Sequence, residues 1–340
     1  MWQPDGLQQP LSLEIVNLHD TANNNMNSSL FTQALRRLTL LLAFAGLLSF
    51  PAHAAPTLDD TPRVAVISAF GSELNLLHAK LEQAQTYTVN GVAFTTGQLQ
   101  GKAVVLFLSG ASMTNAAMNT QLVLDRFRVT HVLVSGIAGG VNPALHIGDV
   151  TVAQRWGQYL EVLMARESAP GKYAIPAWID DAKWPNFGML HPRPVGVRRM
   201  GHGDEEKKFW FDVDANLLAT ATRIQNTELT HCDDTPLRAK SCLDHPPRVV
   251  VGGNGVSGQA FVDNAAFREY TFKTFEANVL DMETAATAMV AYSNGVPFIA
   301  FRSLSDLAGG GGGENEIATF MRIAADNAAR VLLAFLAAWK

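Results

Sequence analysis

Apolar runs and amphipathic segments alternate along most of this chain. Runs rich in β-branched and apolar residues predict strands at 63–69, 103–108, 131–135, 150–153, 248–251, 278–280 and 297–303. Apolar positions at helical spacing predict helices at 72–81, 114–127, 214–224, 264–275, 284–293 and 317–339. Asn90-Gly91 lies between two short β-forming segments and predicts a hairpin. This order predicts one α/β domain with a mixed sheet.

The stretch from 156 to 212 breaks the alternation. It is rich in Pro, Trp and Gly and shows only weak periodicity. We expect a long surface excursion here, of the kind that often lines a binding site.

The N-terminal segment has the pattern of a secretory signal. Arg36-Arg37 precede an apolar run at 38–50 that is too short to span a bilayer, and Ala52-His53-Ala54 gives the small-x-small pattern of a cleavage site. An uncleaved membrane anchor or a buried helix is the alternative. We expect residues 1–54 to be an N-terminal extension and signal peptide, and 55–340 to be the folded domain. The mature chain is then exported, periplasmic or secreted, with no membrane association after cleavage.

Composition and charge narrow the class of partner. The chain has 340 residues, 48% of them apolar, and a net charge of -5, so it can bury a full core. It has no Lys/Arg stripe, which argues against a nucleic-acid partner because phosphate contacts supply most of such affinity. A small-molecule substrate is expected.

Export changes how the two cysteines are interpreted. Cys232 and Cys242 bracket a polar loop, and in an oxidising compartment two thiols close in sequence most often form a disulfide. Metal binding is the weaker interpretation, because no second pair and no His at ligand spacing accompany them. The nine histidines are scattered, so we predict no metal site.

Candidate chemistry lies where the last predicted strand ends. The run 296–306 finishes in Ser305 and Asp306 and then opens into Gly309 to Gly313. This places a carboxylate at the tip of a buried strand, where α/β enzymes keep their active sites. Alternatively, Asp306 caps the turn and the glycines form a flexible linker rather than a hinge.

Several motifs together resemble one family. They are Ser135-Gly-Ile-Ala-Gly-Gly-Val-Asn-Pro with Ile147-Gly-Asp-Val, Asp281-Met-Glu-Thr-Ala-Ala, Arg302-Ser-Leu-Ser-Asp, and the segment 252–264. In this order and spacing they resemble the nucleoside phosphorylase and nucleosidase superfamily. The 5'-methylthioadenosine/S-adenosylhomocysteine nucleosidases and the longer plant phosphorylase-like proteins are the most similar branches.

The resemblance carries expectations about architecture. It implies a three-layer αβα fold with a central mixed, partly barrel-like sheet. It also implies a homo-oligomer, at least a dimer, with sites near subunit contacts. We expect no cofactor.

Within that superfamily the nucleophile is either phosphate or water. A phosphorylase must hold a dianion, normally with arginines near the first strand and the Gly-rich turn. Segments 68–73 and 109–115 contain no Arg or Lys, while Glu73 falls where the nucleosidases carry the carboxylate that activates water. A carboxylate there repels phosphate and polarises water, so hydrolysis is the better prediction.

The resemblance assigns roles to the site residues. Asp306 protonates N7 of the departing purine, with Ser305 orienting it, and Glu73 deprotonates the water and stabilises the oxocarbenium-like sugar. To donate, Asp306 must be partly desolvated or hydrogen-bonded as the acid. The remaining substrate contacts are assigned to Glu283 (ribose hydroxyls), Met282 (sugar face), Phe261 (stacking on the base), the Val262 backbone (base edge) and Arg302 (orienting Glu283), with Ala69, Ser109, Gly139 and Asp281 completing the set.

Each residue also has an ordinary structural interpretation. Glu73 is compatible with a solvated first-turn position favoured by the helix dipole, Met282 with the core, and Phe261 with an ordinary sheet aromatic. Asp281 stands where the nucleosidases more often have Glu, and the chain is longer than the compact bacterial enzymes.

The expected activity is therefore hydrolysis of an adenine-type purine nucleoside, such as 5'-methylthioadenosine or S-adenosylhomocysteine. The alternatives are a purine nucleoside phosphorylase that uses phosphate, and a non-catalytic nucleoside-binding or storage protein.

Overall fold

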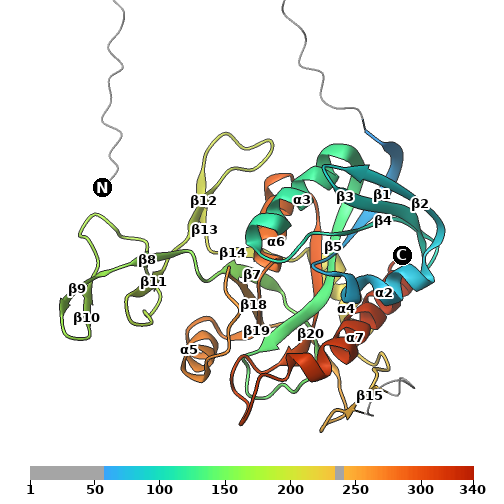
Figure 1. Cartoon of the computed structure of the whole chain (residues 1–340). Helices are drawn as coiled ribbons and strands as arrows, with labels where there is room; N and C mark the ends of the chain where they lie inside the picture. The colour runs from blue at the N-terminus through green and yellow to red at the C-terminus, as the bar shows by residue number, and fades with distance from the viewer. Residues whose placement is uncertain (1–56, 234–240) are drawn as a thin grey trace, which may run out of the picture. The chain divides into compact units, whose positions relative to one another are not determined.

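A mixed sheet of twelve strands forms the centre of the chain in the computed structural model, which describes residues 57–233 and 241–340 (Figure 1). The predicted signal segment lies outside the described residues, so the boundary between 1–54 and 55–340 stays a prediction. The main path of the sheet runs β14-β7-β18-β19-β5-β1-β4-β3-β2, and β6, β17 and β20 branch from it through the pairing of β20 with β5. The predicted α/β fold with a mixed central sheet and flanking helices is confirmed.

The strands of this sheet are β1 (Asp59–Ser68), β2 (Glu82–Val89), β3 (Val92–Leu99), β4 (Lys102–Leu108), β5 (Phe127–Gly140), β6 (Val150–Val152), β7 (Arg155–Gln158), β14 (Trp210–Asp212), β17 (Val249–Val251), β18 (Asn254–Ser257), β19 (Ala277–Asp281) and β20 (Phe298–Asp306). The helices are α2 (Gly71–Lys80), α3 (Met113–Arg126), α4 (Ala215–Thr222), α5 (Ala265–Phe275), α6 (Thr284–Ser293) and α7 (Ile317–Ala338).

β5 is the strand that joins the two halves of the sheet. Its first part pairs in parallel with β1, its second part pairs in parallel with β20, and its last two residues pair antiparallel with β19. Every residue of β20 is buried, because the strand is paired on both edges and α7 packs against it. This accounts for its continuous apolar run, which is typical of strands covered on both faces.

Two helix pairs cover the sheet around β5 and β20. α2 packs against α7, and α3 packs against α6, with β5 and β20 running between the pairs (Figure 1). The apolar side chains of β1, β4, β5 and β20 form one continuous core with these helices. The carboxyl ends of β1, β5, β19 and β20 are thereby held in one place.

The strand predicted at 131–135 is too short, and the strand β18 was not predicted. β5 continues through Gly136 and Gly139 to Gly140, and β18 forms at Asn-Gly-Val-Ser. Glycine lowers β propensity, so neither segment has a strand pattern, yet both pair with neighbours on each side. These two segments therefore form strands because neighbouring strands pair with them.

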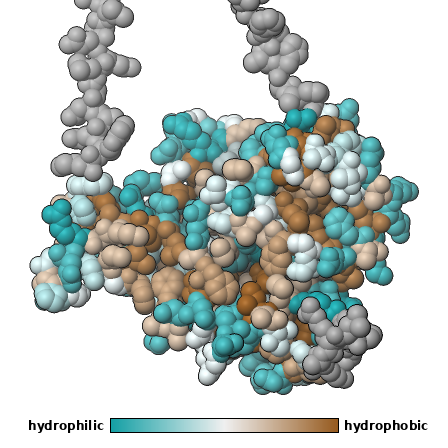
Figure 2. Space-filling view, viewed as in Figure 1, coloured by the Kyte–Doolittle hydropathy of each residue, from teal (hydrophilic) through white to brown (hydrophobic). Residues whose placement is uncertain are grey.

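The prediction of a surface excursion at 156–212 was wrong at both ends. β7 and β14 belong to the central sheet, and Trp156, Tyr159 and Phe211 are buried there. Between them lie three two-stranded ribbons, formed by β8 (Val162–Met164) with β11 (Leu190–Pro192), β9 (Arg166–Ala169) with β10 (Lys172–Ala174), and β12 (Val195–Val197) with β13 (Glu206–Lys208). These ribbons extend from the body (Figure 1), and Figure 2 shows apolar residues at the surface of this extension. Met164, Trp178 and Met189 are exposed there.

The predicted disulfide between Cys232 and Cys242 is confirmed. It joins the short strands β15 (Cys232–Asp233) and β16 (Ser241–Cys242). Two residues of α7 contact this region. Arg322 Nε lies 2.7 Å from Asp233 Oδ2, and Asn327 Oδ1 accepts a hydrogen bond of 2.7 Å from the N–H of Thr230, just before the hairpin.

In the part of the chain that the structure describes, no helix has the length and hydropathy needed to cross a bilayer.

Candidate active site

The carboxyl ends of the central strands surround a cavity of about 160 Å³. Its lining residues come from α2, β5, β19, β20, the start of α7 and the loops beside them. They are Phe70, Glu73, Ala111, Ile137, Ala138, Gly139, Ala260, Phe261, Val262, Leu280, Asp281, Met282, Glu283, Ser305, Asp306 and Ile317. Because the lining combines apolar side chains with a few carboxyl groups, the cavity has the character of a small-molecule site.

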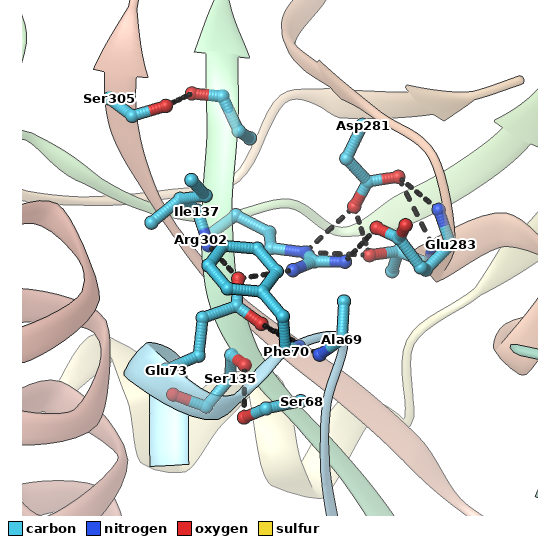
Figure 3. Close-up of polar contacts among 12 residues, drawn as sticks. Ser68, Ala69, Phe70, Glu73, Ser135, Ile137, Asp281, Glu283, Arg302 and Ser305 are labelled. Carbon is cyan, nitrogen blue, oxygen red and sulfur yellow. Dashed lines mark hydrogen bonds and ion pairs between the residues drawn. The ribbon is translucent and has the colours of Figure 1, made fainter. Parts of the chain in front are cut away.

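Glu73 lies in the first turn of α2 and is only 1% exposed. Its Oε2 accepts hydrogen bonds from the N–H groups of Ala69, at 2.6 Å, and Phe70, at 3.3 Å, and its Oε1 accepts one of 2.8 Å from Ile137 (Figure 3). The solvated first-turn alternative is therefore excluded. Three backbone donors hold this carboxyl group against the cavity wall.

Gly136 provides the room that this arrangement needs. A Cβ atom at that position would lie 2.4 Å from Glu73 Oε1 and 2.1 Å from Arg302 Nη1. Real Cβ contacts do not approach so closely, so any side chain would displace Glu73 or Arg302. The glycine is thus required for the close approach of both side chains to β5.

Arg302, on β20, lies at the centre of three carboxyl groups (Figure 3). Its Nε is 2.7 Å from Asp281 Oδ2, its Nη2 is 3.2 Å from Glu283 Oε2, and its Nη1 is 3.7 Å from Glu73 Oε1. Its Nε is also 2.9 Å from Thr284 Oγ1. The guanidinium therefore fixes the relative positions of β19, β20 and α2.

One buried cation faces three buried carboxyl groups, so full ionisation of all three is unfavourable. Burial raises the pKa of Glu73 to about 7, although Arg302 and the backbone donors oppose the rise. Burial also raises the pKa of Glu283, and the charge of Asp281 adds to that rise. Burial would lower the pKa of Arg302, but the three carboxylates outweigh it and raise this pKa above its ordinary value.

Asp281 lines the cavity, but its carboxylate is buried and bound by neighbouring protein groups. Its Oδ1 accepts from Ser257 Oγ at 2.5 Å and from the N–H groups of Glu283 and Thr284, and its Oδ2 contacts Arg302 and the Thr284 hydroxyl. These contacts occupy both oxygens. Asp281 thereby positions Arg302 and the first turn of α6.

Glu283 lines the cavity just before the start of α6. Its Oε1 accepts a 2.8 Å hydrogen bond from the Ser112 N–H, and its Oε2 faces Arg302. Met282 lines the cavity beside it. This pair can offer a hydrogen-bond acceptor and an apolar surface to one ligand.

Asp306 ends β20 and is 3% exposed. Its Oδ2 accepts from Ser305 Oγ at 2.8 Å, and its Oδ1 accepts from the Ala308 N–H at 2.8 Å and from Asn315 Nδ2 at 3.4 Å. Glu73 and Asp306 thus line the same cavity from two different elements.

Three of the residues predicted to bind substrate do not line the cavity. Ala69 contributes its N–H to Glu73, Arg302 lies behind the carboxyl groups, and Ser109 is buried with its hydroxyl 2.9 Å from the Gly110 carbonyl oxygen. The other seven, together with the two predicted catalytic residues Glu73 and Asp306, lie along the lining, with Val262 buried and Phe261 56% exposed.

Several lining residues carry no recognisable signal in the sequence. Phe70, Ala111, Ile137, Ala260, Leu280 and Ile317 line the cavity, and Asn315 contacts Asp306. Most of them are apolar, so the sequence does not distinguish them from residues of the hydrophobic core. Phe70 alone had a positional signal, because it immediately precedes the helix that carries Glu73.

Among the described residues that line the cavity, four are carboxylic acids and none is Lys or Arg. Across residues 57–233 and 241–340, no group of three or more His, Cys, Asp or Glu side chains is arranged to hold a metal ion.

Comparison with known proteins extends this description. The family model described as the phosphorylase superfamily matches residues 63–337. A 5'-methylthioadenosine/S-adenosylhomocysteine nucleosidase of Bacillus thuringiensis (strain Al Hakam) is 31% identical over 252 residues, which cover 73% of this chain and 87% of the relative.

Solved structures share the fold at lower identity. The nucleosidase of the same name from S. pneumoniae, bound to the transition-state inhibitor MT-ImmA, has a TM-score of 0.59 and 24% identity, and the match covers 82% of this chain and 100% of that one. Futalosine hydrolase of Helicobacter pylori has a TM-score of 0.58 and 21% identity, covering 81% and 97%.

Proposed function

The chain belongs to the phosphorylase superfamily, and from this premise we propose that it hydrolyses the N-glycosidic bond of an adenine-type purine nucleoside and releases the free base. The substrates proposed are 5'-methylthioadenosine and S-adenosylhomocysteine, which the name of the Bacillus relative specifies for that protein. The observation that carries the proposal is the pair of acidic residues, Glu73 and Asp306, on one cavity.

Electrostatics favours water over phosphate as the nucleophile. Phosphate is normally held by arginine forks or lysines, and the described lining has neither. Arg302 is buried, and its charge is already shared among three carboxyl groups. A phosphate dianion entering this cavity would face Glu73, Glu283 and Asp306 without a free cation.

In the proposed reaction, Asp306 donates one proton and Glu73 accepts another. The Asp306 carboxyl proton moves to N7 of the purine while the bond between C1' and N9 breaks, and the electron pair of that bond goes to the base. A water oxygen bonds to C1' as Glu73 removes a proton from that water. Ionised Glu73 also stabilises the positive charge that develops on the sugar.

Other side chains bind and orient the nucleoside in this proposal. Glu283 accepts hydrogen bonds from the ribose hydroxyls and Met282 packs on the sugar. Phe261 stacks on the base, and the backbone at Val262 contacts its edge. Arg302 and Asp281 act behind them as positioning residues, since their contacts are to other side chains.

Product analysis with and without phosphate tests the proposal. The purified mature chain is incubated with 5'-methylthioadenosine, and the sugar product is identified. Release of adenine and methylthioribose at a rate that does not depend on phosphate supports hydrolysis. Formation of a sugar 1-phosphate only when phosphate is present would identify a phosphorylase, and binding without turnover would identify a nucleoside-binding protein.

We also propose that the mature chain is exported and that it forms a homodimer. The disulfide between Cys232 and Cys242 supports export, because disulfides persist in oxidising compartments. N-terminal sequencing of the secreted or periplasmic fraction tests the proposed cleavage after Ala54, and light scattering tests the dimer.

A further inference from the structure

Asn315 joins the proposed catalytic acid to the segment that is proposed to bind the base. Its Nδ2 is 3.4 Å from Asp306 Oδ1 and 3.1 Å from Asp263 Oδ1, while its Oδ1 accepts a 3.0 Å hydrogen bond from the Ile317 N–H. Both ends of the amide are therefore used. The reversed amide would set an oxygen against two carboxyl groups and an NH2 group against an N–H donor, so the orientation is determined by its neighbours.

The two segments joined by Asn315 also contact each other directly. The Asn264 N–H donates a 3.1 Å hydrogen bond to the Ala308 carbonyl oxygen. A Cβ atom at Gly309 would lie 2.3 Å from the Asn264 nitrogen, so the backbones touch. Phe261 and Val262, which line the cavity, precede this contact, and Asp306 precedes Ala308.

We propose that Asn315 is a positioning residue for the acid step, and this inference rests on the proposed function. Its N–H and that of Ala308 both donate to Asp306 Oδ1, which keeps Oδ1 an acceptor. The transferred proton is then carried by Oδ2. Ser305 Oγ, 2.8 Å from Oδ2, has the Ala138 carbonyl oxygen as a second acceptor at 3.4 Å, so it can release Oδ2. Because the same amide holds Asp263, the acid keeps its place relative to the base-binding segment.

A positioning role predicts loss of rate without loss of binding. Without Asn315, Asp306 keeps its contacts to Ser305 and Ala308 but loses its link to Asp263. The cavity lining itself is unchanged, because Asn315 is not part of it. Small displacements of a catalytic group reduce rate strongly.

The test compares two variants at this position. Asn315→Asp keeps an oxygen for the Ile317 N–H but replaces the donor between the two carboxyl groups, and Asn315→Ala removes both. We expect kcat for 5'-methylthioadenosine to fall about 10- to 100-fold in both. Kd for 5'-methylthiotubercidin, in which carbon replaces N7, should change less than about 3-fold, because this analogue cannot take the proton. Glu314→Gln is the matched control, since Glu314 is the exposed neighbour in the same loop, and its kcat should stay within about twofold of the wild-type value.

Two results would overturn the inference. One is an unchanged kcat in both variants. The other is a parallel loss of kcat and of analogue binding, which would show that Asn315 only supports the pocket. Both are measured against a wild-type chain that releases adenine, whereas absence of turnover in the wild type would instead reject the proposed function.

Discussion

At the scale of single residues, the site depends on one guanidinium that serves three carboxyl groups. Arg302 is buried among Asp281, Glu283 and Glu73, and burial raises the pKa of both glutamic acids. A general base works best when its pKa lies near the operating pH, and about 7 for Glu73 meets that condition. The environment therefore suits Glu73 to accept a proton from water.

The first prediction concerns the pH dependence of hydrolysis. Because Glu73 must be ionised to act as a base and its raised pKa is about 7, log kcat/KM should rise with pH up to about 7. Glu73→Gln should lower kcat/KM about 10²- to 10⁴-fold and remove this acid limb. A pH profile of 5'-methylthioadenosine hydrolysis measures both. An unchanged acid limb in the Gln variant would assign the limb to another group.

The second prediction concerns the stability of the buried charge cluster. Arg302→Met leaves carboxylates buried without their cation and should lower the free energy of unfolding by about 3–5 kcal/mol. The loss should be smaller at pH 5.5 than at pH 8, because protonation removes the uncompensated charge as pH falls. Urea unfolding at both pH values measures it. Arg248→Met, which removes a 60% exposed partner of Asp149, is the control and should cost no more than about 1 kcal/mol; equal losses in the two variants would contradict the account.

At the scale of elements, the alternation of apolar runs predicted the main strands and helices. It did not predict the strand segments that contain glycine. β18 and the second half of β5 form because neighbours on both sides pair with them, which no local pattern records. The ends of the predicted excursion were wrong because Trp156 and Phe211 pack into the sheet.

For the candidate site as well, the sequence indicated some residues but not all of their contacts. Asp306 was found from its place at a strand end, and Glu73 from family resemblance. The contact of Asp281 with Ser257 does not follow from the sequence. The contact of Asn315 with Asp306 does not either, since a run of glycines separates Asn315 from the strand. The path of such a run depends on tertiary packing.

The third prediction tests the close packing of β5 beneath the site. Gly136→Ala should displace Glu73 or Arg302, because the added Cβ would lie within 2.4 Å of both side chains. We expect kcat/KM for 5'-methylthioadenosine to fall about 100-fold or more. Gly203→Ala is the control, since no atom lies within 4 Å of its Cβ position. Wild-type activity in the Gly136 variant would refute the geometry described here.

The fourth prediction concerns the hairpin of β15 and β16. Replacing Cys232 and Cys242 together by Ser should lower the free energy of unfolding by about 2–3 kcal/mol, because the disulfide restricts the unfolded chain. Dithiothreitol should reduce wild-type stability to the same level and leave the double variant unaffected. Thermal unfolding with and without the reductant measures this, and a wild-type midpoint insensitive to complete reduction would contradict it.

At the scale of the whole molecule, the fold brings distant parts of the chain to one cavity. Glu73 comes from the first helix described, Glu283 from the start of α6, and Asp306 from the last strand. β5 joins these regions, because it pairs with β1, β19 and β20. In the proposed reaction, a single nucleoside lies with its base beside Asp306 and its sugar beside Glu73, two of the acids that line this cavity.

A crystal structure of the mature chain with methylthio-immucillin-A would show whether one ligand lies between these two acids. We expect the Asp306 carboxyl group at hydrogen-bonding distance, about 2.6–3.2 Å, from N7 of the bound base analogue. We also expect the Glu73 carboxyl group on the side of the sugar from which water attacks, and Glu283 within hydrogen-bonding distance of the ribose hydroxyls. An inhibitor bound elsewhere, or bound here with Asp306 or Glu73 turned away from it, would rule out the proposed roles of these two acids.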